Sequence, residues 1–262
     1  MPIRKPKWVA HGLARDFANE EFTLLSLAAA NWLRSTDVEI SAEVAAEEAE
    51  QNLEEILKFL HEYMFSLTED GIEPTFEIEG DLSEAYIRAK SREANEYRKA
   101  MAVMDPIMFE DLCRRILIAM GAKQGSRTGQ SGDGGVDFVA RALQICSPAS
   151  VGARVQIIGQ AKRYAIHLTV GDREMREFVG GAIKRVADPT DKLVYRSERL
   201  APVIYAFWTT AEFTSSALTY AKSIGLWHLN GLGLAQLAIK NNVPLVEARL
   251  PEAMEDGMVV VV

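Results

Sequence analysis

Apolar and polar positions change their period along the second half of the chain, and this change separates predicted helices from predicted strands. Apolar residues recur at three- and four-residue steps after Asp105-Pro106, which is typical of a helix with an Asp N-cap and Pro in its first turn. Short apolar runs further on predict buried strands. Strands are predicted at 136–143, 153–164, 203–210 and 226–229, and further helices at 172–186, 211–225 and 230–242. The order α-β-β-α-β-α-β-α predicts an α/β domain around a small sheet.

Helical periods dominate the first 104 residues. We predict helices at 19–35, 41–66 and 81–103, the last with Asp81 and Glu84 at capping-box spacing, and a strand at 75–80. Residues 1–17 show no clear period. We therefore expect three parts: a mainly α-helical N-terminal region (1–104), an α/β domain (105–250) and a tail (251–262), which forms an edge strand or stays disordered.

Charge divides the chain in the same place. The net charge of −8 is the sum of −10 over residues 1–104, +5 over 105–250 and −3 over the tail. Only the middle part suits a polyanion electrostatically, whereas the acidic part suits dimerisation or a partner protein, or is simply a solvated face.

Composition excludes several classes of protein. The hydrophobic content of 48% and the charged content of 25% are ordinary for a globular chain. No apolar run approaches a membrane span, and Cys113 and Cys146 have no metal-ligand spacing, so we expect a cytoplasmic protein with reduced, buried thiols. The four histidines are scattered, and no phosphate-binding GxxxxGK[ST] motif occurs.

Candidate chemistry gathers in residues 131–164. Asp137 opens one apolar run, and Gln160, Ala161 and Lys162 close the next. Side chains alternate along a strand, so Gln160 and Lys162 share a face. If the two runs pair, a carboxylate, an amide oxygen, a backbone carbonyl and an ammonium meet at one sheet edge, where Mg²⁺ and a phosphodiester would fit, with Glu110 reaching the metal through water. Taken singly, the same residues also suit a turn and solvated surfaces.

The ordered blocks resemble a known family. FEDLCRRILIAMG, TGQSGDGGVDFVA, VQIIGQAKRY, REFVGGA, FWTTAEFTSSALTYA and LNGLGLAQL are similar to the catalytic domain of Mrr-like restriction endonucleases, a branch of the PD-(D/E)xK nuclease superfamily, over about 105–241. The resemblance implies a central mixed sheet flanked by helices, Mg²⁺, double-stranded DNA as substrate, and Gln in place of the usual second acid. It assigns catalysis to Glu110, Asp137, Gln160 and Lys162, and metal binding to Asp137, Gln160, Ala161 and Glu110.

We expect contacts to DNA from the glycine-rich loop, the end of the second predicted strand and the polar segment 188–202, where simple solvation is an equal alternative. The residues are Gln130, Ser131, Asp133, Arg163, Lys192 and Arg196. The leading hypothesis is a Mg²⁺-dependent DNA endonuclease of a restriction or phage-defence system. It would act as a homodimer, because a double-strand break needs two active sites. The alternative is a catalytically silent nuclease fold that binds DNA or a partner protein.

Overall fold

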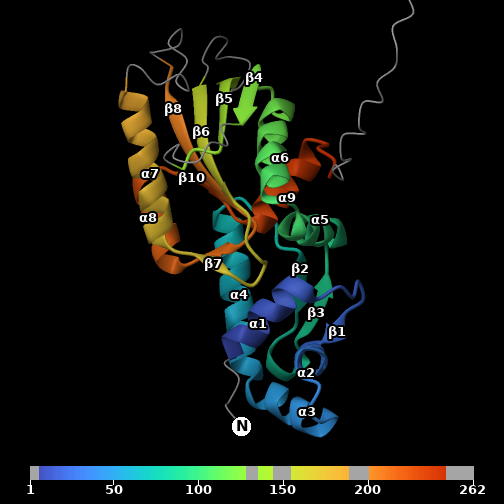
Figure 1. Cartoon of the computed structure of the whole chain (residues 1–262). Coiled ribbons are helices and arrows are strands. Elements are labelled where there is room, and N and C mark those ends of the chain that lie inside the picture. Colours follow the sequence, from blue (N-terminus) through green and yellow to red (C-terminus); the bar gives the residue numbers. More distant parts are fainter. Residues whose placement is uncertain (1–5, 128–134, 144–154, 189–200, 246–262) are drawn as a thin grey trace, which may run out of the picture.

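The computed structural model describes residues 6–127, 135–143, 155–188 and 201–245. Within these ranges the chain forms two lobes, with a five-stranded sheet and its helices in one and the N-terminal elements in the other (Figure 1). Cys146 and the tail lie outside the described residues. No helix in the described ranges is long and apolar enough to cross a membrane.

The central sheet has the order β10-β8-β6-β5-β4 and mixes both strand directions. Strand β5 pairs antiparallel with β4 and β6, whereas β6, β8 and β10 are parallel. The strands are β4 (Gln124–Arg127), β5 (Phe138–Leu143), β6 (Val155–Lys162), β8 (Val203–Thr209) and β10 (Trp227–Leu229). The predicted strands are confirmed, and β4 was missed because its sequence, QGSR, carries no alternating apolar signal.

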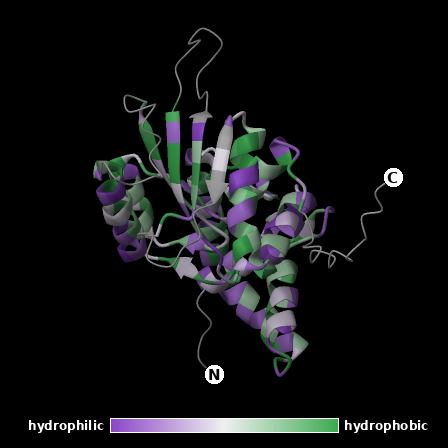
Figure 2. Cartoon of the chain, turned by 45° about the horizontal axis from the view of Figure 1, so that its top comes forward, coloured by the Kyte–Doolittle hydropathy of each residue, from purple (hydrophilic) through white to green (hydrophobic). Residues whose placement is uncertain are grey.

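Helices cover both faces of this sheet. Helices α6 (Pro106–Ala119) and α9 (Gly231–Lys240) lie on one face, and α7 (Asp172–Ala187) and α8 (Ser215–Ile224) on the other (Figure 1). Side-chain alternation along β8 supplies both cores, because Trp208 packs with α6 and α9 whereas Phe207 packs with α7 and α8. The flanking helices alternate between hydrophobic and hydrophilic stretches, as amphipathic helices do (Figure 2). The predicted α/β architecture is therefore confirmed.

The N-terminal lobe differs from the prediction in several elements. The chain forms α1 (Pro6–Asp16), β1 (Thr23–Leu24), α2 (Leu25–Thr36), α3 (Ala42–Gln51), α4 (Leu53–Glu69), β2 (Phe76–Glu79), the 3-10 helix η1 (Leu82–Glu84), β3 (Tyr86–Ala89) and α5 (Arg92–Val103). Helix α1 was not predicted, α2 begins later than expected because 23–24 pair with β3, and the helix expected over 41–66 is two helices that meet at Asn52.

The helix predicted at 81–103 is wrong over nearly its first half, since α5 begins only at Arg92. Ile78 pairs with Ile87 in an antiparallel β2–β3 ladder, and Ile87 is fully buried there. Tertiary pairing of this apolar side chain outweighs the charge spacing that suggested a capping box at Asp81. Helix α5 starts instead at Arg92, where the Ser91 side chain accepts a hydrogen bond from the Ala94 N–H as the N-cap.

The two lobes share core residues across residue 104. Tyr97 and Met101 of α5 belong to the apolar core that also contains α6 and α9, and Ala94 packs with Leu232 of α9. The Tyr97 hydroxyl donates a 2.8 Å hydrogen bond to the Val243 carbonyl. Helix α5 is therefore one of the elements that fasten the N-terminal lobe to the sheet-containing lobe.

Candidate active site

The start of β5 lies beside the end of β6. Phe138 pairs with Gly159 in the antiparallel register, which puts Asp137 opposite Gln160 at the margin of the ladder. The Asp137 N–H donates to the Gly159 carbonyl at 2.9 Å, and the Ala161 N–H donates to Oδ2 of Asp137 at 2.8 Å. The carboxylate thus accepts the hydrogen bond that a backbone carbonyl would accept in a regular antiparallel pair, and this fixes it at the sheet edge.

The Gln160 side chain lies against the glycine turn that precedes β5. Gly135 has φ +77°, and a Cβ built there would stand 2.7 Å from Nε2 of Gln160. Gln160 is 5% exposed, so its amide is held between this turn and the sheet. Glycine is required at 135 both by the left-handed backbone and by the close approach of the amide.

Alternation along β6 separates Lys162 from the core. The Ala161 side chain packs in the core with α6 and α9, so Gln160 and Lys162 lie on the other face of the strand, as predicted. The Lys162 carbonyl accepts from Oγ1 of Thr209 at 2.7 Å and from the Thr210 N–H at 3.2 Å. These two threonines at the end of β8 fix the main chain that carries the lysine, a role that sequence reasoning missed.

Helix α6 brings a second carboxylate to the same neighbourhood. Cys113 of α6 is fully buried, and burial raises the pKa of its thiol well above the ordinary value. The negative charges of Asp137 and Glu110 raise this pKa further, so both carboxylates lie within electrostatic reach of one thiol. Cys113 therefore stays protonated as a core residue, and Glu110 and Asp137 both lie in its electrostatic surroundings.

The donor set suits a hard divalent cation. Among the described residues no group of three or more His, Cys, Asp or Glu side chains could hold a metal. The candidate set instead combines the carboxylates of Asp137 and Glu110 with the neutral oxygens of Gln160 and the Ala161 backbone. Mg²⁺ takes one or two carboxylates and keeps several waters, so these residues fit it. The site residues themselves remain a prediction.

The predicted DNA contacts are only partly placed. Nη1 of Arg163 donates to the Ala102 carbonyl at 3.2 Å, which ties the end of β6 to α5. Gln130, Ser131, Asp133, Lys192 and Arg196 lie outside the described residues.

A family model matches part of the sheet-containing lobe. Residues 101–195 match the model of the Mrr catalytic family, described as restriction endonuclease. This match confirms the resemblance predicted from the sequence blocks. No curated protein matches the chain.

Two of the solved structures that it resembles are restriction endonucleases. MspJI in complex with a 27-mer oligonucleotide is 18% identical, with a TM-score of 0.40 and coverage of 58% of this chain and 33% of that chain. FokI bound to DNA is 12% identical, with a TM-score of 0.35 and coverage of 91% and 45%. This chain thus spans less than half the length of either protein. Because both TM-scores lie below 0.5, what these proteins bind says nothing about the ligands of this chain.

Proposed function

We propose that this chain, whose residues 101–195 match the Mrr restriction-endonuclease family, is a Mg²⁺-dependent endonuclease that hydrolyses phosphodiester bonds of double-stranded DNA. The observation that carries the proposal is the position of the Asp137 carboxylate. This carboxylate accepts from the Ala161 N–H at the point where Gln160 and Lys162 end the adjacent strand. The four groups that phosphodiester hydrolysis would use are therefore Asp137, Gln160 and Lys162 beside or on two paired strands, and Glu110 on α6.

Each residue has a distinct task in this proposal. Asp137 and Glu110 supply negative charge for the metal, and Gln160 and the Ala161 carbonyl supply neutral oxygens. When bound, Mg²⁺ would act as a Lewis acid on the phosphate and on a coordinated water. The Lys162 ammonium, on the face of β6 that Gln160 shares, orients the attacking water and offsets charge on the phosphate.

We also propose that the protein works as a homodimer in restriction or phage defence within the cytoplasm. One active site cuts one strand, so a double-strand break requires a second copy. The acidic N-terminal lobe, with net charge −10 over 1–104, is repelled by DNA and is free for dimerisation or a partner protein. Sedimentation of the full chain tests this, and a monomer at every concentration with intact double-strand cleavage would contradict it.

Plasmid cleavage tests the catalytic proposal. Wild-type protein with Mg²⁺ should nick or linearise supercoiled DNA, and EDTA should abolish cleavage. Lys162→Ala should lower the rate by about a hundredfold or more, since it removes one transition-state charge contact. Lys58→Ala, an exposed lysine on α4 far along the chain from the site, is the matched control and should cleave like wild type.

The outcomes separate the function from the site. Absence of cleavage by wild type on methylated and unmethylated DNA, supercoiled and linear, would favour the catalytically silent binding module. Equal cleavage by Lys162→Ala and wild type would instead refute the assignment of Lys162.

A further inference from the structure

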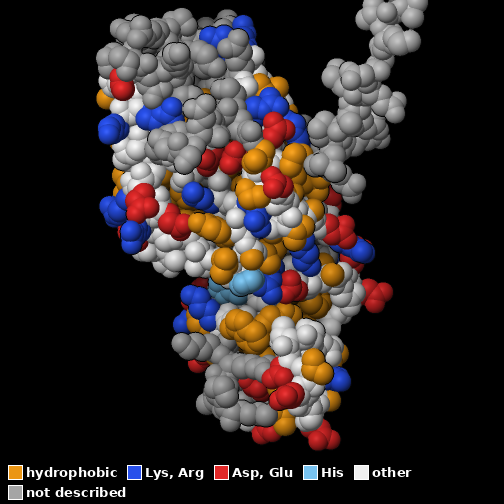
Figure 3. Space-filling view, viewed as in Figure 1, with side chains coloured by type: hydrophobic (Ala, Val, Ile, Leu, Met, Phe, Trp, Pro, Cys, Tyr) orange, Lys and Arg blue, Asp and Glu red, His pale blue; other side chains and the backbone are white. Residues whose placement is uncertain are grey.

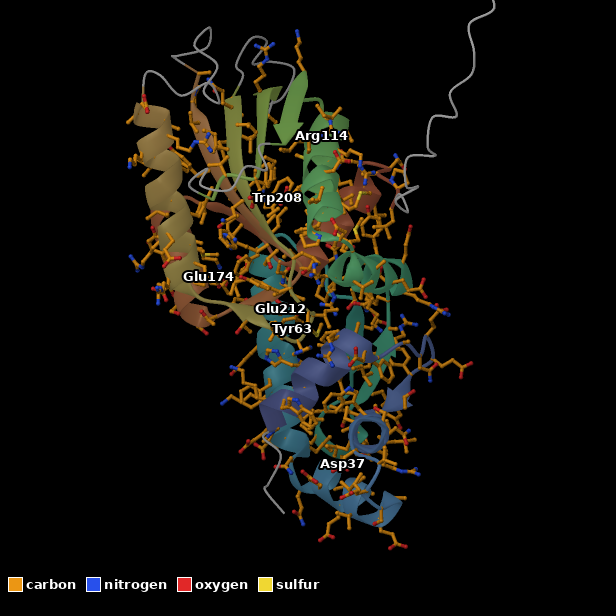
Figure 4. All side chains as sticks on the ribbon, viewed as in Figure 1. Asp37, Tyr63, Arg114, Glu174, Trp208 and Glu212 are labelled. Carbon is orange, nitrogen blue, oxygen red and sulfur yellow. The ribbon has the colours of Figure 1, made fainter. Side chains whose placement is uncertain are left out.

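A cavity of about 640 Å³ lies where the two lobes meet. Its walls come from α1, α4 and α5 on one side and from residues 166–169 and 212–215 on the other. Figure 3 shows histidine side chains at this waist, next to lysine or arginine side chains. Figure 4 shows Tyr63 and Glu212 close together there, and they are linked by a hydrogen bond. The volume falls within the range of small-molecule sites, and no residue of the candidate active site lines the cavity.

Cationic side chains outnumber acids in this lining. Lys7, Arg15 and Arg98 line the cavity together with His11 and His167; burial lowers the pKa of His11, and Arg15 is paired with Asp16. Glu212 is the one carboxylate among the lining residues that the structure describes, and its two oxygens are engaged.

The contacts of Glu212 come from both lobes. Oε1 accepts from the Tyr63 hydroxyl at 3.3 Å and from Nη1 of Arg98 at 3.5 Å, and Oε2 accepts from Nδ2 of Asn230 at 2.7 Å. Glu212 therefore takes up one of the Arg98 donors, and Lys7 together with Nε of Arg98 favours an anion.

Arg98 is the buried group that gives the strongest reason to expect a ligand. Its side chain is only 3% exposed, and its contacts to Glu212 and to the Arg15 carbonyl are long, at 3.5 and 3.4 Å. Its Nε has no acceptor among the residues that the structure describes. A buried guanidinium donor without an acceptor is costly, so an anionic oxygen in the cavity would supply what this side chain lacks.

Aromatic rings form another part of the wall. Trp8 is 45% exposed and stacks edge-on against Trp32 with 4.4 Å between ring centroids. His11 and Tyr63 lie 5.6 Å apart on the same side of the cavity. Ser215, the first residue of α8, also lines it, so the positive end of a helix dipole faces the space.

We infer that this cavity binds a nucleoside phosphate. The exposed indole and the neighbouring rings suit a planar base, and Lys7, Arg98, His167 and the α8 N-terminus suit phosphate oxygens. A ligand there contacts both lobes at once, since Lys7 and Arg98 belong to the N-terminal lobe and His167 to the sheet-containing lobe.

Calorimetric titration of the full chain with ATP in EDTA tests the site. Wild type should bind ATP in the micromolar range, and Lys7→Ala and His167→Ala should each weaken binding by about tenfold, the value of one charge-assisted phosphate contact. Trp8→Ala should weaken ATP and adenosine alike. Lys58→Ala, an exposed lysine outside the cavity, should bind ATP like wild type.

Several results would overturn the inference. Absence of ATP and AMP binding at millimolar concentration would refute the site. Wild-type affinity in both Lys7→Ala and His167→Ala would refute its location. Inorganic phosphate binding as tightly as ATP would refute the nucleoside part, and full displacement of ATP by a short DNA duplex would indicate a DNA-backbone contact instead. Asp137→Ala should keep ATP binding, so failure of the nuclease proposal leaves this test unchanged.

Discussion

Replacing Asp137 by asparagine and by alanine separates its structural role from its proposed role in metal binding. The Ala161 N–H donates to the carboxylate at 2.8 Å, and a hydrogen bond to a charged group contributes about 1.5–3 kcal/mol. Asp137 is half-buried, so we take the lower end and expect Asp137→Ala to cost about 1.5–2 kcal/mol. For a chain of 262 residues this corresponds to a fall in Tm of roughly 3–8 °C.

Asp137→Asn should behave differently. The amide oxygen still accepts the Ala161 N–H, and loss of the negative charge removes repulsion from Glu110, whose charge also reaches Cys113. Without Mg²⁺ this variant should therefore melt at or slightly above the wild-type Tm. With millimolar Mg²⁺ the order should reverse, because ligand binding stabilises only the protein that retains the site.

Thermal unfolding followed by circular dichroism, with EDTA and with Mg²⁺, measures this reversal. The same unfolding measurement with calcium chloride, in the absence of DNA, provides a second divalent cation for comparison. Equal Tm shifts with Mg²⁺ in wild type and Asp137→Asn would refute the metal assignment. Equal destabilisation by asparagine and alanine would refute the role of the Ala161 hydrogen bond.

Other predictions concern glycines and a histidine. Gly135→Ala should abolish cleavage, because its Cβ would displace the Gln160 amide 2.7 Å away, whereas Gly121→Ala, with φ +103° and no atom within 4 Å, should cost about 1–2 kcal/mol of stability without loss of cleavage. Gly231→Ala should lower Tm by several degrees, since a backbone carbonyl oxygen lies 2.4 Å from the new Cβ; an unchanged Tm would show that α9 can shift. Burial lowers the pKa of His11 below its ordinary 6.5, so the unfolded chain binds the proton more tightly and stability falls as pH drops below about 6.5. His11→Gln should flatten the decline of Tm between about pH 7 and 5.5, and an unaltered decline would contradict this.

The sequence predicted the sheet-containing lobe well because local patterns and tertiary packing agree there. Asp105 and Pro106 start α6 as expected, and the apolar runs became β5, β6 and β8. The residue set Asp137, Gln160 and Lys162 could also be chosen from sequence, since strand alternation fixes which side chains share a face. The supports of that site could not, because Thr209 and Thr210 reach the Lys162 carbonyl only through β6–β8 pairing.

In the N-terminal lobe, local patterns were a weaker guide. Residues 86–89 lie within a charged segment with helical spacing, yet they form β3 because Ile87 is buried by pairing with β2. Such pairing depends on residues of another strand, and the period within one segment does not record it.

The sequence by itself determined most elements of the sheet-containing lobe, β4 excepted, and the resemblance of residues 101–195 to the Mrr family, because periodicity and residue type are properties of the chain. Only the tertiary structure decided how those elements meet. In the folded chain the Asp137 carboxylate accepts from the Ala161 N–H, and the charges of Glu110 and Asp137 both reach Cys113. The apolar core of the sheet-containing lobe also includes residues of α5. The tertiary structure also created the cavity between the lobes, whose walls come from residues 7–98 and 166–215, because a cavity exists only after distant surfaces pack.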